Sequence, residues 1–235
     1  MHAETAQVGI TDYLFWVALP YAVLAIFVLG HIYRYITDPM SWTSKSSELL
    51  EKKLLRFGSM PFHYGIILVL AGHVIGLLIP KAVHEALGLS DHVYHIIAVI
   101  GGLFAGFLTL LGLIVLTYRR FAIKRVLANS SAGDIVVLVL LLLVVLAGLT
   151  ATLSNIDGSF DYRENIAPWL RGILTLRPDP TLMVDVPIIF KLHIFLVMLL
   201  FAVWPFTRLV HVLSFPVVYI WRSYIVFRRR CGDMN

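Results

Sequence analysis

Five long apolar runs determine what this chain can fold into. They lie at about residues 13–33, 62–80, 93–118, 135–153 and 186–206, and each approaches or exceeds the roughly 20 residues that an α-helix needs to cross a bilayer. Hydrophobic residues make up 59% of the 235, which is more than soluble domains contain. We therefore predict an all-α integral membrane protein: a five-helix transmembrane bundle that forms a single domain over residues 1–235.

Basic residues are unevenly distributed between the loops. The loops after the first and third runs and the C-terminal tail hold most of them: Arg34, Lys45, Lys52, Lys53, Arg56, Arg119, Arg120, Lys124, Arg125, Arg222, Arg228, Arg229 and Arg230. The other two loops hold Lys81, Arg163, Arg171 and Arg177. Because cytoplasmic loops are enriched in Lys and Arg, we predict an N-terminus outside and a cytoplasmic C-terminus. The net charge of +5 then reflects topology, and no nucleic-acid partner is expected.

The first twelve residues indicate whether the first apolar run is a cleaved signal peptide or a permanent transmembrane span. The segment MHAETAQVGITD has no Lys or Arg and no small-residue cleavage site, so it lacks the features of a signal peptide. We expect the first run to be a permanent span.

Four histidines lie in or beside the second and fifth runs. Ionisable side chains are costly inside a membrane and usually mark a functional site. His63 and His73 are 10 residues apart, and His193 and His211 are 18 apart. If residues 191–212 form one helix, 18 residues make five whole turns, so both side chains leave the same face about 27 Å apart. The separation on the second run is about 15 Å.

The order of the spans predicts how these histidines pair. The second and fifth helices run in opposite directions, so His63 and His211 belong near the cytoplasmic face, and His73 and His193 in the outer half. Two opposed imidazoles are the axial ligands of a b-type haem, and we predict two haem b groups, one on each pair. Tilt, a register offset or a kink at Pro205 must absorb the difference between about 15 Å and about 27 Å.

The cysteine content limits the other redox centres. Cys231 is the only cysteine, and the chain has no C-x-x-C-H motif. An iron–sulfur cluster and a covalently attached haem are therefore excluded. We expect no role for Cys231 itself.

Other polar residues are weaker candidates. Arg208, one turn before His211, and Arg120, at the end of the third run, are possible partners of haem propionates, although topology explains these arginines equally well. We interpret His31 as an interfacial residue. The outer loop contains His84, His92 and His95. We interpret each of them individually as a solvated loop histidine. Together they are weak candidates for proton release beside a quinone pocket, because histidine as a residue type titrates near neutral pH.

Several segments together resemble one known family. FKLHIFLVMLLFAVWPFTRLVHV, LAGHVIGLLIP, FHYG, YRR and SAGDI resemble the membrane-anchoring gamma subunit of respiratory nitrate reductase, a dihaem cytochrome b. The resemblance covers about residues 13–224, and PFTRLVH is its most specific part. The family has a lysine near its quinol pocket, in the loop leading into the third helix; here that stretch reads SDHVYH.

The resemblance implies a quinol-oxidising subunit of a bacterial or archaeal cytoplasmic (inner) membrane. It implies that His63 and His211 ligate the inner haem, and His73 and His193 the outer one, which agrees with the pairing above. The implied partners are membrane quinol and, on the cytoplasmic side, an iron–sulfur beta subunit and a molybdenum alpha subunit. Quinol would be oxidised near the outer haem, its protons released outside and its electrons passed inward for nitrate reduction.

Three alternatives remain open at this point. A related membrane cytochrome b serves a sulfur-compound or heterodisulfide reductase, and copurifying subunits would distinguish it. A proton transporter relays protons through its histidines and needs no haem. A passive anchor would retain quinol-dependent activity after His73→Ala.

Overall fold

The protein is helical throughout the part of the chain that the structure describes. The computed structural model describes residues 9–43 and 46–213, and no strand occurs within these ranges. Lys45, the basic C-terminal tail and Cys231 lie outside them. Five helical stretches are long and apolar enough to cross a membrane: Ile10–Thr37, Lys53–Leu78, Asp91–Ala122, Ala132–Ser154 and Ile188–Phe206. The prediction of an all-α bundle with five spans is confirmed.

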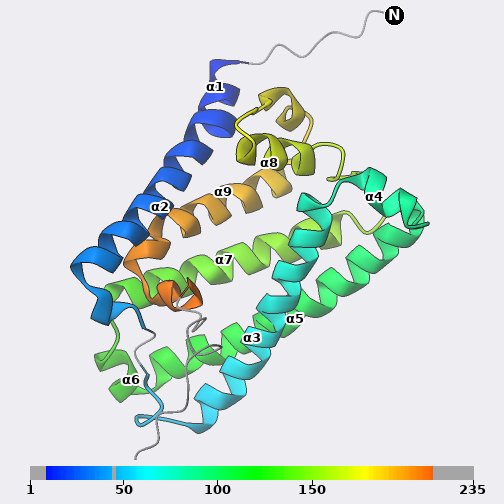
Figure 1. The fold of residues 1–235 in the computed structure, drawn as a ribbon. Helices are drawn as coiled ribbons and strands as arrows, with labels where there is room; N and C mark the ends of the chain where they lie inside the picture. The colour runs from blue at the N-terminus through cyan, green and yellow to red at the C-terminus, as the bar shows by residue number, and fades with distance from the viewer. Residues whose placement is uncertain (1–8, 44–45, 214–235) are drawn as a thin grey trace, which may run out of the picture.

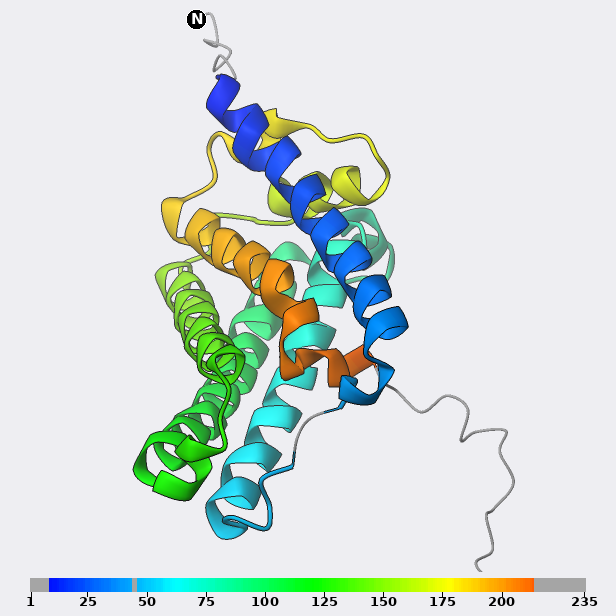
Figure 2. The same cartoon turned by 90° about the vertical axis from the view of Figure 1, so that its left-hand side faces the viewer.

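The main helices pack in a series. They are α2 (Leu19–Thr37), which continues α1 (Ile10–Tyr13) and a π-helical stretch, then α3 (Lys53–His73), α5 (Asp91–Ala122), α7 (Ala132–Ser154) and α9 (Ile188–Val203). Along the series α3 packs on α5, α5 on α7, α7 on α9, and α9 on α2 (Figures 1 and 2). The helices that carry His73 and His193, α3 and α9, are therefore separated in the series by α5 and α7.

Glycines set the closest contact in the bundle, between α3 and α5. A Cβ atom added at Gly65 would overlap Thr109, and one added at Gly112 would overlap the backbone of Phe62. Small residues of this kind let two membrane helices approach closely. α3 and α5 are thus closely packed against each other, and this packing fixes the position of the helix that carries His63 and His73.

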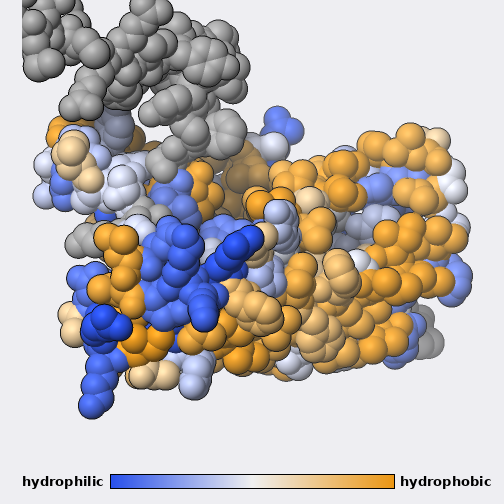
Figure 3. Space-filling view, turned by 90° about the horizontal axis from the view of Figure 1, so that it is seen from below, coloured by the Kyte–Doolittle hydropathy of each residue, from blue (hydrophilic) through white to orange (hydrophobic). Residues whose placement is uncertain are grey.

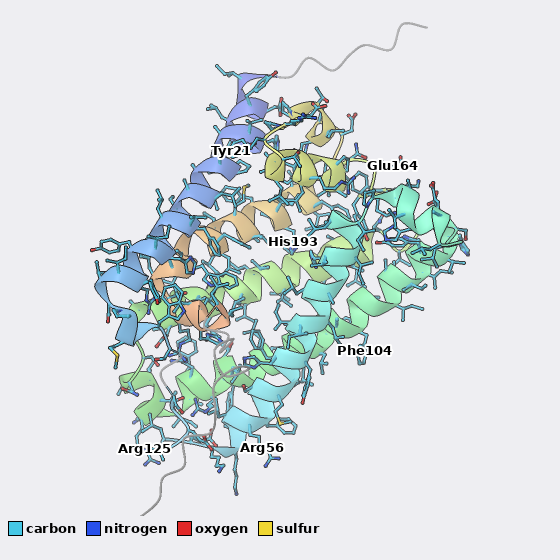
Figure 4. All side chains as sticks on the ribbon, viewed as in Figure 1. Tyr21, Arg56, Phe104, Arg125, Glu164 and His193 are labelled. Atoms are coloured by element: carbon cyan, nitrogen blue, oxygen red, sulfur yellow. The ribbon has the colours of Figure 1, made fainter. Side chains whose placement is uncertain are left out.

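The bundle has two distinct ends. One, the α6 end, carries α6 (Lys124–Ala128) and the first loop; the other, the α8 end, carries α4 (Lys81–Ala86) and α8 (Ile166–Leu174). Arg56 and Arg125 lie at the α6 end, Glu164 lies at the α8 end, and His193 lies between them (Figure 4).

The surface between the ends suits a lipid environment. Seen from below, hydrophobic residues cover a broad stretch of the molecule, and hydrophilic residues gather at one end (Figure 3). Exposed apolar side chains on the main helices include Ile67, Ile100 and Phe104, which are 61%, 64% and 64% exposed. In a soluble monomer a surface of this kind would be a liability, so the composition and the structure agree on a multi-pass membrane protein.

The long fourth loop covers the α8 end. Within it, α8 packs against the π-helical stretch Val74–Leu78 that follows α3. Trp169 packs edge-on against Trp16 with ring centroids 5.9 Å apart, and its indole nitrogen donates to the backbone oxygen of Trp16 at 2.8 Å. These contacts anchor the loop on the first span.

Two helix starts differ from the expected positions. α3 begins at Lys53, well before the apolar run, because the Glu51 carboxylate accepts the N–H groups of Leu54 and Leu55 at 2.8 and 3.2 Å. α7 is capped by Ser131, whose hydroxyl accepts from the N–H of Asp134 while the Asp134 carboxylate accepts from the N–H of Ser131. This is a capping box, in which Ser131 is the N-cap and Asp134 is the acidic third residue of the helix.

The expectation of one continuous helix over 191–212 is wrong. α9 ends at Val203, a 3₁₀ turn covers Trp204–Phe206, Thr207 is extended, and a second 3₁₀ segment covers Arg208–Leu213. Pro205 explains the break because it lacks an N–H group and cannot continue a helix. Arg34 stabilises the turn by donating to the carbonyl oxygens of Pro205 and Thr207 at 2.7 and 2.8 Å.

At the α6 end, Arg119 ties the first loop to α5. Its guanidinium, 3% exposed, lies 2.8 Å from the Glu51 carboxylate and also donates to Ser47 and to the Glu51 backbone. We expect Arg119→Met to lower the thermal stability of the protein clearly, since it removes the ion pair with Glu51 and the hydrogen bonds that join α5 to the first loop. Thermal unfolding in detergent measures this. The matched control is Lys52→Met, which breaks an exposed pair with Glu48 and should change stability by less than about 1 kcal/mol.

Candidate functional site

The structure brings the four predicted histidines together as two pairs. The ring centroids of His63 and His211 are 6.4 Å apart, and those of His73 and His193 are 6.2 Å apart. These are the pairs predicted from the order of the spans. The break at Pro205 resolves the mismatch in their spacing, because His211 does not lie five helical turns beyond His193.

The spacing within each pair fits a shared metal. An imidazole nitrogen binds a metal at about 2 Å, and adding the ring's own half-width on both sides gives centroids about 6 Å apart for two opposed ligands of one ion. Rings in direct contact with each other would also lie within this range, so distance alone does not define the site. The hydrogen bonds of the four rings give a second, independent indication.

Each of the four histidines uses its Nδ1 atom in a hydrogen bond to a backbone carbonyl. The accepting oxygens are those of Ser59 for His63, Val69 for His73, Val144 for His193 and Arg208 for His211, at 2.7, 2.7, 3.1 and 2.6 Å. A carbonyl only accepts, so Nδ1 carries the proton. In the neutral ring the lone pair is then on Nε2. This is the tautomer that metal-ligating histidines adopt, held by the same kind of outer contact.

A glycine on the neighbouring helix makes room for His193. A Cβ atom added at Gly148 on α7 would lie 2.9 Å from Cε1 of the His193 ring. The ring therefore lies against the backbone of α7, where it also reaches the Val144 carbonyl. The sequence did not indicate this role, since Gly148 lies in a largely aliphatic helix that also contains Gly133, Ala147 and Ala151.

The donor set fits a haem better than a bare metal ion. Among the described residues no group of three or more His, Cys, Asp or Glu side chains is arranged to hold a metal. Each pair offers two imidazoles whose Nδ1 atoms are bonded elsewhere, and a porphyrin would supply the remaining four ligands of an iron. His63 and His73 are exposed on the surface of α3, and a Cβ atom added at Gly72 would meet nothing within 4 Å, so bulky groups are not packed against this part of α3.

The two candidate propionate arginines meet at one carboxylate. Asp134 lies 2.6 Å from Nε of Arg208 and 3.5 Å from Nη1 of Arg120, whose guanidinium also donates to Ser130. Arg208 also supplies the carbonyl that binds His211. Asp134 therefore positions the segment that carries His211, and a propionate role for the arginines stays a prediction.

The remaining histidines occupy different settings. His31 is buried rather than simply interfacial, and its ring packs against Phe27 and Trp42. At the α8 end, His92 is exposed and His95 bonds to the carbonyl of Ile156. His84 is 3% exposed, which is not the setting of the solvated loop residue that the sequence suggested.

Fold and site together define a class: a multi-pass helical membrane protein with two imidazole pairs, formed by its second span, its fifth span and the segment that follows the fifth. Residues 12–230 match the family model described as nitrate reductase gamma subunit. The chain belongs to this family, which confirms the resemblance seen in the sequence. It is therefore a membrane subunit of a respiratory nitrate reductase, an oxidoreductase complex, and has partner subunits.

Similar proteins cover nearly the whole chain. The nitrate reductase gamma chain of Bacillus subtilis is 52% identical over 218 residues, which are 92% of this chain and 98% of that one. The respiratory nitrate reductase 1 gamma chain of Escherichia coli is 34% identical over 90% of this chain and 94% of its own length. The nitrate reductase-like protein NarX of Mycobacterium tuberculosis is 41% identical over 92% of this chain but only 34% of its own length.

Proposed function

We propose that this chain is the quinol-oxidising dihaem subunit of its complex, with one haem b on each histidine pair. The observation that carries the proposal is that both pairs combine a centroid distance near 6 Å with Nδ1 bound to a carbonyl. His73 and His193 would hold the haem nearer the α8 end, and His63 and His211 the haem nearer the α6 end.

The protein would hold the two haems and orient the histidine rings that bind them. Haem iron accepts and gives up single electrons, and its axial ligands and burial set the potential. The carbonyl oxygens on Nδ1 fix each ring's orientation and make Nε2 a better ligand. The Asp134 carboxylate, by holding Arg208, steadies the 3₁₀ segment that presents His211.

We further propose that the α6 end faces the cytoplasm of a bacterial or archaeal cell and the α8 end faces outward. The basic side chains at the α6 end, such as Arg56 and Arg125 (Figure 4), support this orientation through the positive-inside bias. An iron–sulfur beta subunit and a molybdenum alpha subunit would then dock at the α6 end. The names of the gamma-chain relatives support nitrate as the final acceptor.

Optical spectroscopy of the purified complex tests this function. We expect reduced-minus-oxidised bands of two b-type haems per chain, reduction by a quinol analogue, and reoxidation by nitrate. A complex without haem bands would contradict the proposal and favour a proton relay through the histidines. Haem bands in a complex that reoxidises with a sulfur compound or a heterodisulfide, and not with nitrate, would favour a related reductase.

A further inference from the structure

A buried polar cluster lies at the α8 end, about one helical turn beyond the outer histidine ligand. The hydroxyl groups of Tyr94 on α5 and Tyr162 in the fourth loop are 3.0 Å apart. Both lie against Gly76, where a Cβ atom would be 2.9 and 2.8 Å from the two oxygens. Gly76 is three residues after His73, within the π-helical stretch Val74–Leu78. Because Gly76 has no side chain, both hydroxyl groups reach its backbone, three residues beyond His73.

His84 adds a titratable ring to this cluster. It is 3% exposed, its ring centroid is 4.7 Å from that of Tyr94, and neither ring nitrogen has a hydrogen-bond partner. Arg163 stacks over the same tyrosine at 4.1 Å, is 5% exposed, and its Nη1 atom is also buried without a partner. Buried polar atoms in native proteins are nearly always bonded. Two such groups on one tyrosine therefore indicate a place that binds water or substrate hydroxyls.

The cluster continues to the surface through ion pairs. Arg163 lies 2.8 Å from Asp161 and 2.9 Å from Asp91, and Lys81 lies 3.0 Å from Asp91 and 2.7 Å from Glu164. Asp91 and Glu164 are 57% and 61% exposed. Arg163, which stacks on the Tyr94 ring, thus links the buried tyrosine pair to ion pairs that reach the outside of the α8 end.

The pKa shifts of Tyr162 and Asp161 favour the passage of protons between groups over the retention of a proton on either one. Burial raises the pKa of the Tyr162 hydroxyl, and the bond with Tyr94 raises it further, so Tyr162 keeps its proton at neutral pH and passes protons along hydrogen bonds. Burial acts to raise the pKa of Asp161, but hydrogen bonds from Arg163 outweigh it and the net pKa is lowered. Asp161 is therefore ionised at neutral pH, and a proton that reaches it is released readily to water.

We propose that His84, Tyr94 and Tyr162 form the route by which protons leave the quinol site, with the surface carboxylates as its exit. The inference rests on the proposed function. One quinol becomes one quinone by losing two electrons to the haem pair and two protons. Each proton passes through the hydroxyl pair and then, by water bound at the unpartnered nitrogens of His84 and Arg163, to Asp161, Asp91 or Glu164 and to the outside. Breaking each quinol O–H bond is thus balanced by a proton released outside.

The test compares Tyr162→Phe and His84→Gln in the full complex, with His92→Gln as the matched control on an exposed histidine at the same end. General acid–base groups contribute about 10²–10⁴-fold, so we expect each variant to lower kcat for quinol oxidation at least tenfold with KM nearly unchanged. We also expect a larger solvent deuterium isotope effect and a pH profile shifted to higher pH, because hydroxide must then take the proton. His92→Gln should match the wild type.

Two further readouts separate the possible outcomes. The dithionite-reduced haem spectrum shows whether each variant still binds both haems. Variants with normal haem, kcat, isotope effect and pH profile would overturn the route, even if lower thermal stability showed that the cluster fastens the loop. Absence of haem or of quinol oxidation in the wild type would instead mean that the proposed function has failed.

Discussion

His73→Ala is expected to remove one of the two haems and to abolish quinol-driven reduction of the other. The reason is geometric: His73 is the imidazole that lies opposite His193, so its removal leaves that ring without its partner. His63→Ala should remove the other haem. In that variant quinol should still reduce the remaining haem, but nitrate should no longer reoxidise it.

The measurement is haem content per chain together with two kinetic traces, reduction by quinol and reoxidation by nitrate. The comparison of the two variants is more informative than the loss of either haem alone. Loss of reduction by quinol in His73→Ala but not in His63→Ala would assign the quinol site to the α8 end. His92→Ala, an exposed histidine outside both pairs, is the control and should retain both haems. If both ligand variants lost reduction by quinol while keeping reoxidation, the assignment of the quinol site would be wrong.

The sequence predicted the spans and the pairing because both depend on simple patterns. Apolar length identifies a span, and the parity of the spans determines which histidines share an end. Arg119 and Arg120 were recognised as the inner boundary of the third span, but their partners were not. Glu51 comes from a loop 68 residues away, and Asp134 from the next helix. Such contacts depend on the packed arrangement of helices, which no local pattern reports.

The end of α9 shows the same limit. Pro205 marked a possible kink, but the sequence did not show that the helix would stop and resume as a 3₁₀ segment. The stop is stabilised by Arg34, 171 residues away in the sequence, which supplies donors to the two carbonyls that the break exposes. In the sequence, the break was indicated by Pro205 itself and by the unequal histidine spacings of 10 residues on the second run and 18 on the fifth.

The strongest test of how the outer site is positioned is Gly148→Val, which changes no ligand. Its Cβ atom would lie 2.9 Å from the His193 ring, and the branch would add two more carbons. A free ring could swing aside at little cost, but a ring fixed between Val144 and a metal cannot. We therefore expect loss of the haem at His73 and His193 and retention of the other haem, with at least a tenfold fall in quinol oxidation.

Spectra of the reduced variant report which haem is kept, and its electron paramagnetic resonance signal reports whether the ligand geometry has changed. The matched control is Gly101→Val on α5, where an added Cβ meets nothing within 4 Å; it carries the same helix-propensity change and should keep both haems. Normal haem content in Gly148→Val would show that His193 binds from a different position. Gly148 contacts His193, which belongs to the outer pair, and not the pair formed by His63 and His211. Loss of both haems would therefore mean that the substitution disturbs the whole bundle rather than one site.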